Sequence, residues 1–284
     1  MTVSFRRADE GDAAELGRIC FEAFKAIAEA HNYPPDFPSP EVAAGLLGMM
    51  IGHEGWFETV AVADGKIIGS NFLDERGPIT GVGPITVDPA AQDEGLGRLM
   101  MEQVIARSHA RGFDGIRLVQ AGYHRRSLAL YLKLGFDVRE HLTAFAGPAI
   151  GQAPPGFDVR PMTAADTAAC NQLCVRVHGH DRGGEVADAA AQGDATVVRR
   201  DGRITGYATR IGMFGHAVAE TTEDLQALIA AQETPLGPFL APTRNSELMR
   251  WCFEKGLRIV MPMTLMSMGF YQEPKGAWLP SILY

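Results

Sequence analysis

The chain has 284 residues, of which 46% are hydrophobic and 21% are charged, close to the averages of folded globular proteins. This length suffices for two domains of ordinary size, each with its own core. The formal net charge is −8 and no basic patch is clustered in the sequence. Nucleic-acid binding is therefore not expected, because a phosphate backbone needs such a patch.

The cysteines and the N-terminal residues bear on the cellular compartment. Cys20, Cys170, Cys174 and Cys252 are irregularly spaced, so they suggest no disulfide framework and suit a reducing environment. The first residues, MTVSFRRADEGD, lack the apolar core of a signal peptide. No apolar run approaches the roughly 18 residues of a membrane span. We therefore expect a cytoplasmic protein without a membrane partner.

In chain order, the first half alternates helices and strands. Apolar residues at helical spacing predict a helix over 12–29, with Asp12 as its N-cap. The four prolines of HNYPPDFPSP exclude regular helix. The remaining expected elements are helices at 41–51, 95–111 and 124–134, strands at 57–63, 66–73, 82–87 and 116–120, and a final pair of strands. This order predicts an α/β domain with a mixed sheet.

Three sequence echoes in the same order indicate an internal duplication. The first echo is an extended start, a polar turn and an amphipathic helix, found in VSFRRADEGDAAELGRICFEAF and again in FDVRPMTAADTAACNQLCVRVH. The second is a hairpin pattern with an Asp-Gly turn, found in TVAVADGKIIGS and again in ATVVRRDGRITGY. RRSLALYLKLGF resembles SELMRWCFEKGL near the end. The segment FAGPAIGQAPPG between the halves is rich in Gly and Pro, which predicts a linker. We predict domains at 1–147 and 157–284, joined by a linker at 148–156.

The loop DPAAQDEGLGR, residues 88–98, suits a bound anion at the start of a helix. Gly95 and Gly97 would let backbone N–H groups approach a phosphate, and the helix dipole adds positive potential. Asp93 and Glu94 carry the opposite charge into the same loop. The alternative is a helix start that these acids merely cap.

Read together with HRRSLALYLKLGFDVRE downstream, this loop resembles the GNAT superfamily of N-acyltransferases. The family carries a Q/R-x-x-G-x-G/A loop and later an N-x-x-A/S-x-x-L-Y-x-x-x-G-F helix. The matching residues are Gln92, Gly95 and Gly97 in the loop, and Ser127, Leu130, Tyr131, Gly135 and Phe136 in the helix. The resemblance covers residues 3–146 well and 157–284 in outline. It implies an α/β (α+β) fold class with two tandem GNAT-like domains, each a mixed, splayed β-sheet flanked by helices.

The resemblance also implies a site for acetyl-CoA as cosubstrate, without a metal. The pantetheine arm would pair with the edge of a strand, and the pyrophosphate would meet N–H groups at the start of the helix. The implied binding residues are Ile85, Thr86, Val87, Gln92, Asp93, Glu94, Gly95, Leu96, Gly97, Arg98, His124 and Ser127. His124 stands where the family has Asn, so a solvent-facing histidine at a helix start is the alternative for that position.

For catalysis, the resemblance assigns Tyr131 as the acid that protonates the departing coenzyme A thiolate. A phenol can do so if a hydrogen bond holds the two groups in reach. The alternative is a half-buried aromatic side chain in a helix stripe. The segment GVGPITVDP lacks the glutamate that many relatives use as general base. The remaining candidates are Asp74, Glu75, His53 and His31, and an amine that is already neutral would need none.

The second half lacks the glycine loop. Its counterpart, AETTEDLQALIAAQ, has no glycine and carries Glu220, Glu223 and Asp224, which makes a poor phosphate cradle. Aligning Gly135 with Gly256 places Cys252 opposite Tyr131, and Asn245 opposite His124. The second half is therefore predicted to be a degenerate copy.

Two further patterns in the second half each leave two interpretations open. Cys170, Cys174 and His178 recur every four residues on one helix face, which suits either metal ligands or packed core. The methionines from Met261 onward suit either an adaptable cleft lining or core strands.

We therefore predict an N-acetyltransferase whose N-terminal domain transfers the acetyl group of acetyl-CoA to the amine of a small-molecule acceptor by direct attack. Two alternatives stay open, a non-catalytic acyl-CoA-binding or regulatory module and the transfer of a different acyl group. No nucleic-acid or membrane partner is expected, and the chain would be a monomer or a homodimer. The net acidity and the aromatic, proline-rich segment HNYPPDFPSP favour a small cationic or apolar amine as acceptor.

Overall fold

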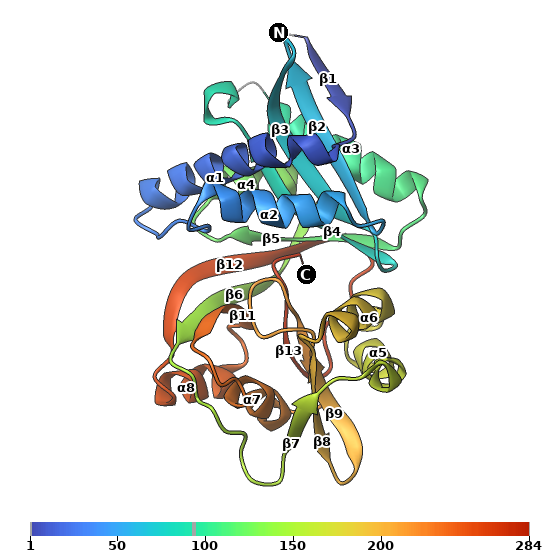
Figure 1. Cartoon of the computed structure of the whole chain (residues 1–284), viewed down its shortest axis with the longest axis vertical. Coiled ribbons are helices and arrows are strands. Elements are labelled where there is room, and N and C mark those ends of the chain that lie inside the picture. Colours follow the sequence, from blue (N-terminus) through green and yellow to red (C-terminus); the bar gives the residue numbers. More distant parts are fainter. Residues whose placement is uncertain (1, 93–94, 284) are drawn as a thin grey trace. The chain divides into compact units, whose positions relative to one another are not determined.

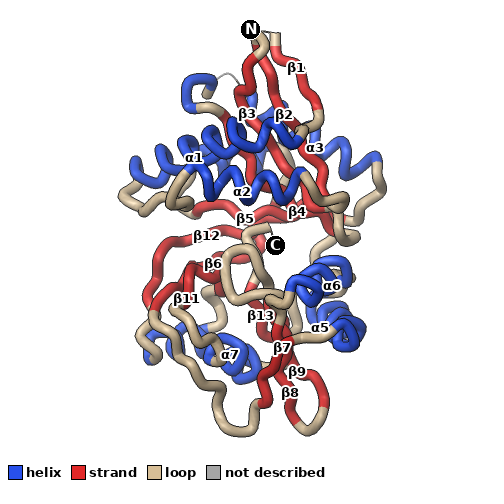
Figure 2. Tube along the Cα trace, viewed as in Figure 1, coloured by secondary structure: helices blue, strands red, loops and turns tan. Residues whose placement is uncertain are grey.

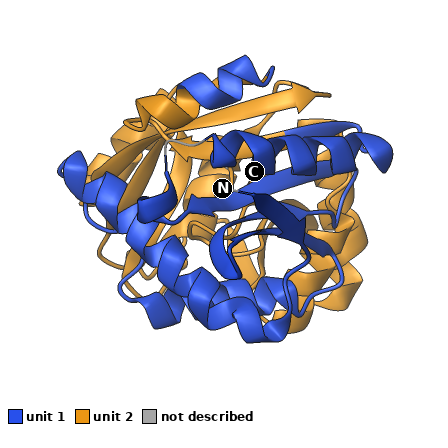
Figure 3. Cartoon of the chain, turned by 90° about the horizontal axis from the view of Figure 1, so that it is seen from above, with its two compact units in different colours: residues 1–116, 129–135 blue, residues 117–128, 136–284 orange. Residues whose placement is uncertain are grey.

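The computed structural model of the chain describes residues 2–92 and 95–283 (Figure 1). Helices and strands alternate along much of it (Figure 2). The chain divides into two compact units (Figure 3). Unit 1 comprises residues up to 116 together with 129–135, and unit 2 comprises 117–128 together with the chain from 136 onward.

Unit 1 is built on strands that pair in the order β1-β2-β3-β4, all antiparallel. Helices α1 and α2 pack against each other and cross in front of these strands in Figure 1, whereas α3 lies behind them. The elements are β1 (Val3–Arg6), α1 (Ala13–Ala30), α2 (Pro40–Ile51), β2 (Trp56–Ala63), β3 (Lys66–Asp74), β4 (Ile79–Val87) and α3 (Leu96–Ala110).

Packing fixes the end of β4 against the first turns of α3. Leu96 and Met100 of α3 form a small core with Ala61, and Ile85 and Val87 pack against it. Because side chains alternate along a strand, Thr86 faces the other way, and its Oγ1 lies 3.4 Å from Ser70 Oγ. The apolar alternation of β4 thus sets the strand end and the helix start side by side.

Unit 2 contains two runs of paired strands. One has the order β5-β12-β6-β11, and the other has the order β13-β10-β9-β8-β7. Helix α4 (Arg125–Lys133) begins in unit 2 and ends in unit 1. The other elements are β5 (Gly115–Ala121), β6 (Asp137–Gly147), β7 (Asp158–Pro161), α5 (Thr167–His178), α6 (Gly183–Gln192), β8 (Thr196–Arg200), β9 (Arg203–Ala208), β10 (Ala217–Ala219), α7 (Thr222–Ala230), β11 (Leu236–Pro242), α8 (Ser246–Glu254), β12 (Arg258–Gly269) and β13 (Ala277–Leu279).

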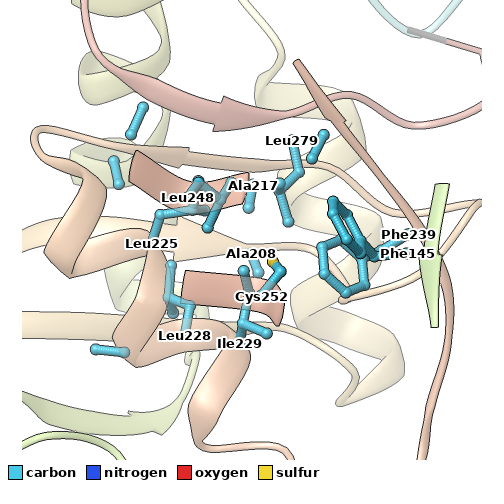
Figure 4. Close-up of a cluster of buried hydrophobic side chains, with 14 of the residues drawn as sticks. Phe145, Ala208, Ala217, Leu225, Leu228, Ile229, Phe239, Leu248, Cys252 and Leu279 are labelled. Carbon is cyan, nitrogen blue, oxygen red and sulfur yellow. The ribbon is translucent and has the colours of Figure 1, made fainter. Parts of the chain in front are cut away.

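Strand β6 comes from the first half of the sequence but pairs with strands of the second half. Its Thr143 lies opposite Ala241 of β11 on one edge and opposite Pro262 of β12 on the other. Its Phe145 is fully buried and stacks on Phe239 at 6.1 Å between ring centroids. Figure 4 shows both rings in one buried cluster with Cys252 and the leucines of α7 and α8. The core of unit 2 therefore includes a strand that precedes the predicted linker.

The first and seventh strands lead into matching helix starts. Arg6 donates two hydrogen bonds to Asp12 at 2.6 and 2.8 Å, and Arg160 donates two to Asp166 at 2.8 Å each. In both cases the carboxylate also accepts the backbone N–H three residues upstream, that of Asp9 or Thr163. The first sequence echo is thus also a structural one. The predicted N-cap role of Asp12 is wrong, because its carboxylate is occupied by Arg6 and by the Asp9 N–H.

Loss of the Asp166 carboxylate should destabilise the protein at neutral pH. The hydrogen bonds from Arg160 hold the pKa of Asp166 well below its usual range, although burial opposes this. A lowered pKa contributes stability above about pH 4 that disappears as the pH falls. We expect Asp166→Asn to cost about 1–3 kcal/mol in urea unfolding at neutral pH and progressively less in acid. Asp158→Asn is the control, because this exposed carboxylate lies 3.6 Å from Arg199 and should contribute little. A cost that does not change with pH would contradict the assignment.

Most elements predicted for the first half are confirmed within a few residues. The segment 31–38 forms neither helix nor strand, as its prolines predict. The final pair of strands is wrong, since Asp137–Gly147 is one continuous strand followed by residues 148–157 without regular structure. No turn residue interrupts DVREHLTAFAG, so nothing in that run can start a hairpin.

Candidate functional site

The predicted anion loop leads directly into α3. Gly95 precedes the helix in the left-handed conformation, with φ of +80°, which a residue with a β-carbon rarely adopts. Backbone geometry therefore accounts for this glycine. Asp93 and Glu94, predicted in the same loop, lie outside the described residues.

Gly97 has no such backbone requirement, because it lies inside the first turn of α3. Among the described residues, a β-carbon placed on it would meet only Leu130 Cδ2, at an ordinary contact distance of 3.8 Å. A glycine inside a helix costs roughly 0.5–1 kcal/mol relative to alanine. Among the described residues, neither conformation nor packing requires a glycine at position 97, which is compatible with the predicted approach of a phosphate to the backbone.

The backbone supplies the hydrogen-bond donors of this helix start. The N–H groups of Arg98 and Leu99 both donate to Gly95 O, at 3.0 and 3.2 Å. The N–H groups of Leu96 and Gly97 come one turn too early to have an acceptor within the helix. They are the donors that the positive end of the helix dipole presents to an anion.

The side chains predicted to assist are engaged with the protein. Gln92 Nε2 donates to Val87 O at 3.2 Å, which ties the loop to the end of β4. Arg98 Nε lies 2.8 Å from Glu102 Oε1 in an exposed pair on the helix surface. Exposed pairs contribute little stability, so Arg98 can exchange Glu102 for a phosphate at small cost.

The predicted pantetheine segment is the end of β4. One edge of the strand pairs with β3, with Ile85 opposite Asn71 and Val87 opposite Gly69. Thr86 is buried, and Ile85 and Val87 are half-buried. The predicted pantetheine binding would use the opposite edge of β4, the edge that does not pair with β3, at these three residues.

Tyr131 is buried in α4, with 6% of its surface exposed. Its neighbour Leu130 is the residue that lies over Gly97. The second half of α4 therefore lies against the start of α3 within unit 1. Two segments that the sequence separates by about thirty residues, the glycine loop and the tyrosine helix, meet in the structure.

His124 and Ser127 lie at the start of α4, in unit 2. His124 Nδ1 is 2.6 Å from Ser127 Oγ, and the backbone N–H of His124 donates to Ala121 O. One ring nitrogen is thus committed to the helix start. Both interpretations of His124, ligand contact and helix-start residue, are compatible with this arrangement.

The four candidate bases all contact other groups of the protein. Asp74 forms a bidentate pair with Arg76, and Glu75 forms one with Arg107 at 2.7 and 2.8 Å. Protonating either carboxylate would sacrifice its arginine pair, so neither is well suited to accept a proton. His53 Nδ1 accepts the Gly55 N–H at 2.9 Å, and His31 Nδ1 lies 2.9 Å from Ile27 O.

Asp36 is a candidate base that the sequence reasoning missed. It lies in the proline-rich segment between α1 and α2, where the residue is exposed to solvent. The protein atoms around its carboxylate nevertheless displace enough water to raise its pKa to about 6. A carboxylate with that pKa can accept a proton near neutral pH. No sequence signal marks it, because the shift depends on its surroundings.

In unit 2, the helix start that corresponds to the glycine loop is filled by the protein's own carboxylate. Thr221 caps α7 by accepting the Asp224 N–H at 3.2 Å. The Asp224 side chain is fully buried and accepts hydrogen bonds from Arg200, at 2.8 and 2.9 Å, and from Thr205, at 2.6 Å. An internal anion thus occupies this helix start, where a phosphate would be repelled.

The other counterparts in unit 2 are also used structurally. Cys252, opposite Tyr131 in the alignment, is fully buried in the core of Figure 4. Asn245, opposite His124, caps α8 by accepting the Leu248 N–H and donates to Thr222 Oγ1. Neither side chain is oriented for the role that its counterpart is predicted to have.

The two open patterns of the second half are both part of packed structure. Cys170 and Cys174 are fully buried in an apolar cluster, and the His178 ring packs edge-on against Trp278. Met261, Met263 and Met266 are buried in β12. Within residues 2–92 and 95–283, no three His, Cys, Asp or Glu side chains are arranged to hold a metal ion. In the same part of the chain, no helix is both long and apolar enough to cross a bilayer.

The acetyltransferase (GNAT) family model matches residues 24–136, a range that holds both the glycine loop and the Tyr131 helix. Residues 24–136 thus match a GNAT acetyltransferase domain. A mycothiol acetyltransferase from a Nocardioides species is 32% identical over 156 residues, covering 48% of this chain and 50% of the relative. Another from Tsukamurella paurometabola is 33% identical over 87 residues and covers 30% of each protein. The chain thus matches half or less of the length of these curated relatives.

Solved structures agree with the GNAT assignment at the level of the fold. A crystal structure from Pyrococcus horikoshii, assigned as an acetyltransferase, superposes with a TM-score of 0.72 at 15% identity, covering 97% of this chain and 94% of the other. A tandem GNAT protein from the clavulanic acid biosynthesis pathway superposes with a TM-score of 0.57 at 12% identity, covering 94% and 98%. The predicted α/β fold class, with splayed mixed sheet and flanking helices, is confirmed.

Proposed function

We propose that this protein is an N-acetyltransferase that transfers the acetyl group of acetyl-CoA to the amine of a small molecule. The observation that carries the proposal is the meeting of the two family motifs in unit 1. Leu130, next to Tyr131, lies 3.8 Å from the β-carbon position of Gly97. The GNAT family match over 24–136 supports the same assignment.

In the proposed binding mode, the pyrophosphate lies against the N–H groups of Leu96 and Gly97. Gln92, Gly95 and Arg98 shape the same loop, together with Asp93 and Glu94. Pantetheine would run along Ile85, Thr86 and Val87, and His124 and Ser127 would contribute from the start of α4. An extended ligand with amide groups can pair with a strand edge in this way.

The proposed reaction is direct attack of a neutral amine on the thioester carbonyl. Backbone N–H groups of β4 would stabilise the negative charge that develops on the carbonyl oxygen. Tyr131 would donate its phenolic proton to the departing thiolate. Asp36 is a candidate to take the proton from an ammonium acceptor, because its pKa is raised to about 6.

The acceptor class rests on the relatives and on charge. The curated relatives are named mycothiol acetyltransferases, which supports a small-molecule acceptor for this chain. The net charge of −8 favours a cationic amine over nucleic acid. We further propose that the chain is two tandem copies at 1–147 and 157–284, joined by 148–156, and acts as a cytoplasmic monomer or homodimer.

Two measurements test the proposed function. Isothermal titration of acetyl-CoA tests the binding site, and release of free thiol in the presence of amino acids, amino sugars, polyamines and compounds of the mycothiol type tests transfer. Binding with amine-dependent thiol release is the expected result. Acetyl-CoA binding without thiol release on any amine would instead favour a non-catalytic acyl-CoA-binding module. Thiol release from another acyl-CoA but not from acetyl-CoA would show that the protein transfers a different acyl group.

The same titration should give one coenzyme site per chain. Because Asp224 already occupies the helix start of α7, the second copy is proposed to be degenerate and should bind no coenzyme. A fitted stoichiometry near two would show that the second copy binds as well. The Gly97→Asp variant serves as the matched control, since it should remove all binding.

A further inference from the structure

Gln120 has a buried side-chain amide that lacks a hydrogen-bond partner within residues 2–92 and 95–283. It lies on β5, on the same face as the buried Leu118, and only 6% of its surface is exposed. Neither its Oε1 nor its Nε2 has a hydrogen-bond partner among the described residues. Strand β5 leads directly into α4, the helix that carries Ser127 and Tyr131.

An amide in this situation is costly for folding. Buried polar side chains in folded proteins nearly always have at least one partner, and an apolar side chain of the same size would avoid the penalty. Asn71 in unit 1 has an orphaned Oδ1, but its Nδ2 still contacts Met100 O at 3.4 Å. Gln120 is the stronger case because both ends of its amide are unsatisfied.

We propose that Gln120 binds the peptide-like amide groups of a ligand. Its Oε1 needs a donor and its Nε2 needs an acceptor. A phosphate or carboxylate offers no donor, and an ammonium group offers no acceptor. An extended chain with amide N–H and C=O groups offers both. This inference rests on the proposed function, under which the source is either the pantetheine arm of acetyl-CoA or an amide-bearing acceptor.

The test replaces Gln120 by methionine, which has a similar length and no amide. Titrations with coenzyme A and with adenosine 3′,5′-bisphosphate, which lacks the pantetheine arm, are compared between wild type and Gln120→Met. The expected result is about tenfold weaker coenzyme A binding with unchanged bisphosphate binding. A raised acceptor KM with unchanged coenzyme A binding would assign Gln120 to the acceptor instead. The melting temperature of the ligand-free variant should not fall.

Gln172→Met is the matched control, because Gln172 is exposed on α5 and should change none of these values. If Gln120→Met fails to fold, Gln120→Ala replaces it. Unchanged coenzyme A affinity together with unchanged acceptor KM would overturn the inference, whatever the melting temperature. Failure of the wild-type protein to bind coenzyme A would instead refute the proposed function.

Discussion

Replacing Gly97 by aspartate should abolish acetyl-CoA binding while the protein stays folded. The new carboxylate would lie within about 4 Å of the phosphates, where two unit charges repel by about 4 kcal/mol at a partly exposed site. We therefore expect the affinity for coenzyme A to fall at least a hundredfold, since about 1.4 kcal/mol corresponds to a factor of ten. Isothermal titration measures this loss.

The same substitution should leave the fold intact or stabilise it slightly. Within the described part of the chain, the β-carbon at Gly97 meets only Leu130, at an ordinary contact distance, and an acid in the first helical turn is favoured by the dipole. A melting temperature at or above that of wild type is therefore expected. Stability and binding change in opposite directions, which separates loss of a site from loss of structure.

Two variants act as controls for Gly97→Asp. Gln103→Glu adds the same charge on an exposed position of α3 about two turns further on, and should weaken binding little. Gly97→Ala adds the β-carbon without the charge and separates steric from electrostatic exclusion. Undiminished coenzyme A binding by Gly97→Asp would remove the glycine loop from the site.

Replacing Tyr131 by phenylalanine should lower turnover strongly with little effect on coenzyme binding. The change removes one hydroxyl from a buried ring and keeps the packing of α4. A positioned general acid contributes a factor of about 10²–10⁴ to rate, so we expect kcat to fall at least a hundredfold. Thiol release under saturating acetyl-CoA, with the best amine of the panel, measures it.

The dissociation constant of acetyl-CoA reports whether Tyr131 acts in chemistry or in structure. An unchanged constant with reduced kcat fits a proton donor to the leaving thiolate. A comparable loss of affinity and melting temperature would indicate that the hydroxyl supports the packing of α4. Wild-type turnover in the variant would remove Tyr131 from the proposed mechanism.

Much of unit 1 could be predicted from local patterns. The spacing of apolar residues determined α1 and α3, the prolines within 31–38 excluded helix from that segment, and the Asp-Gly turns placed the hairpins. The missed features depend on surroundings. Asp12 sits at a helix start as predicted, but only the neighbouring Arg6 decides that its carboxylate forms an ion pair and no cap.

By itself, the sequence determined the family of residues 24–136, the order of elements and the absence of a glycine cradle from the second half, because each follows from residue type and spacing along the chain. Only the tertiary structure decided that no atom of the described residues forbids a side chain at Gly97, that Asp224 fills the second helix start, and that β6 pairs with β11 and β12. It alone also revealed the orphaned amide of Gln120. These facts concern residues far apart in the chain, and burial and hydrogen bonding between such residues leave no local signature.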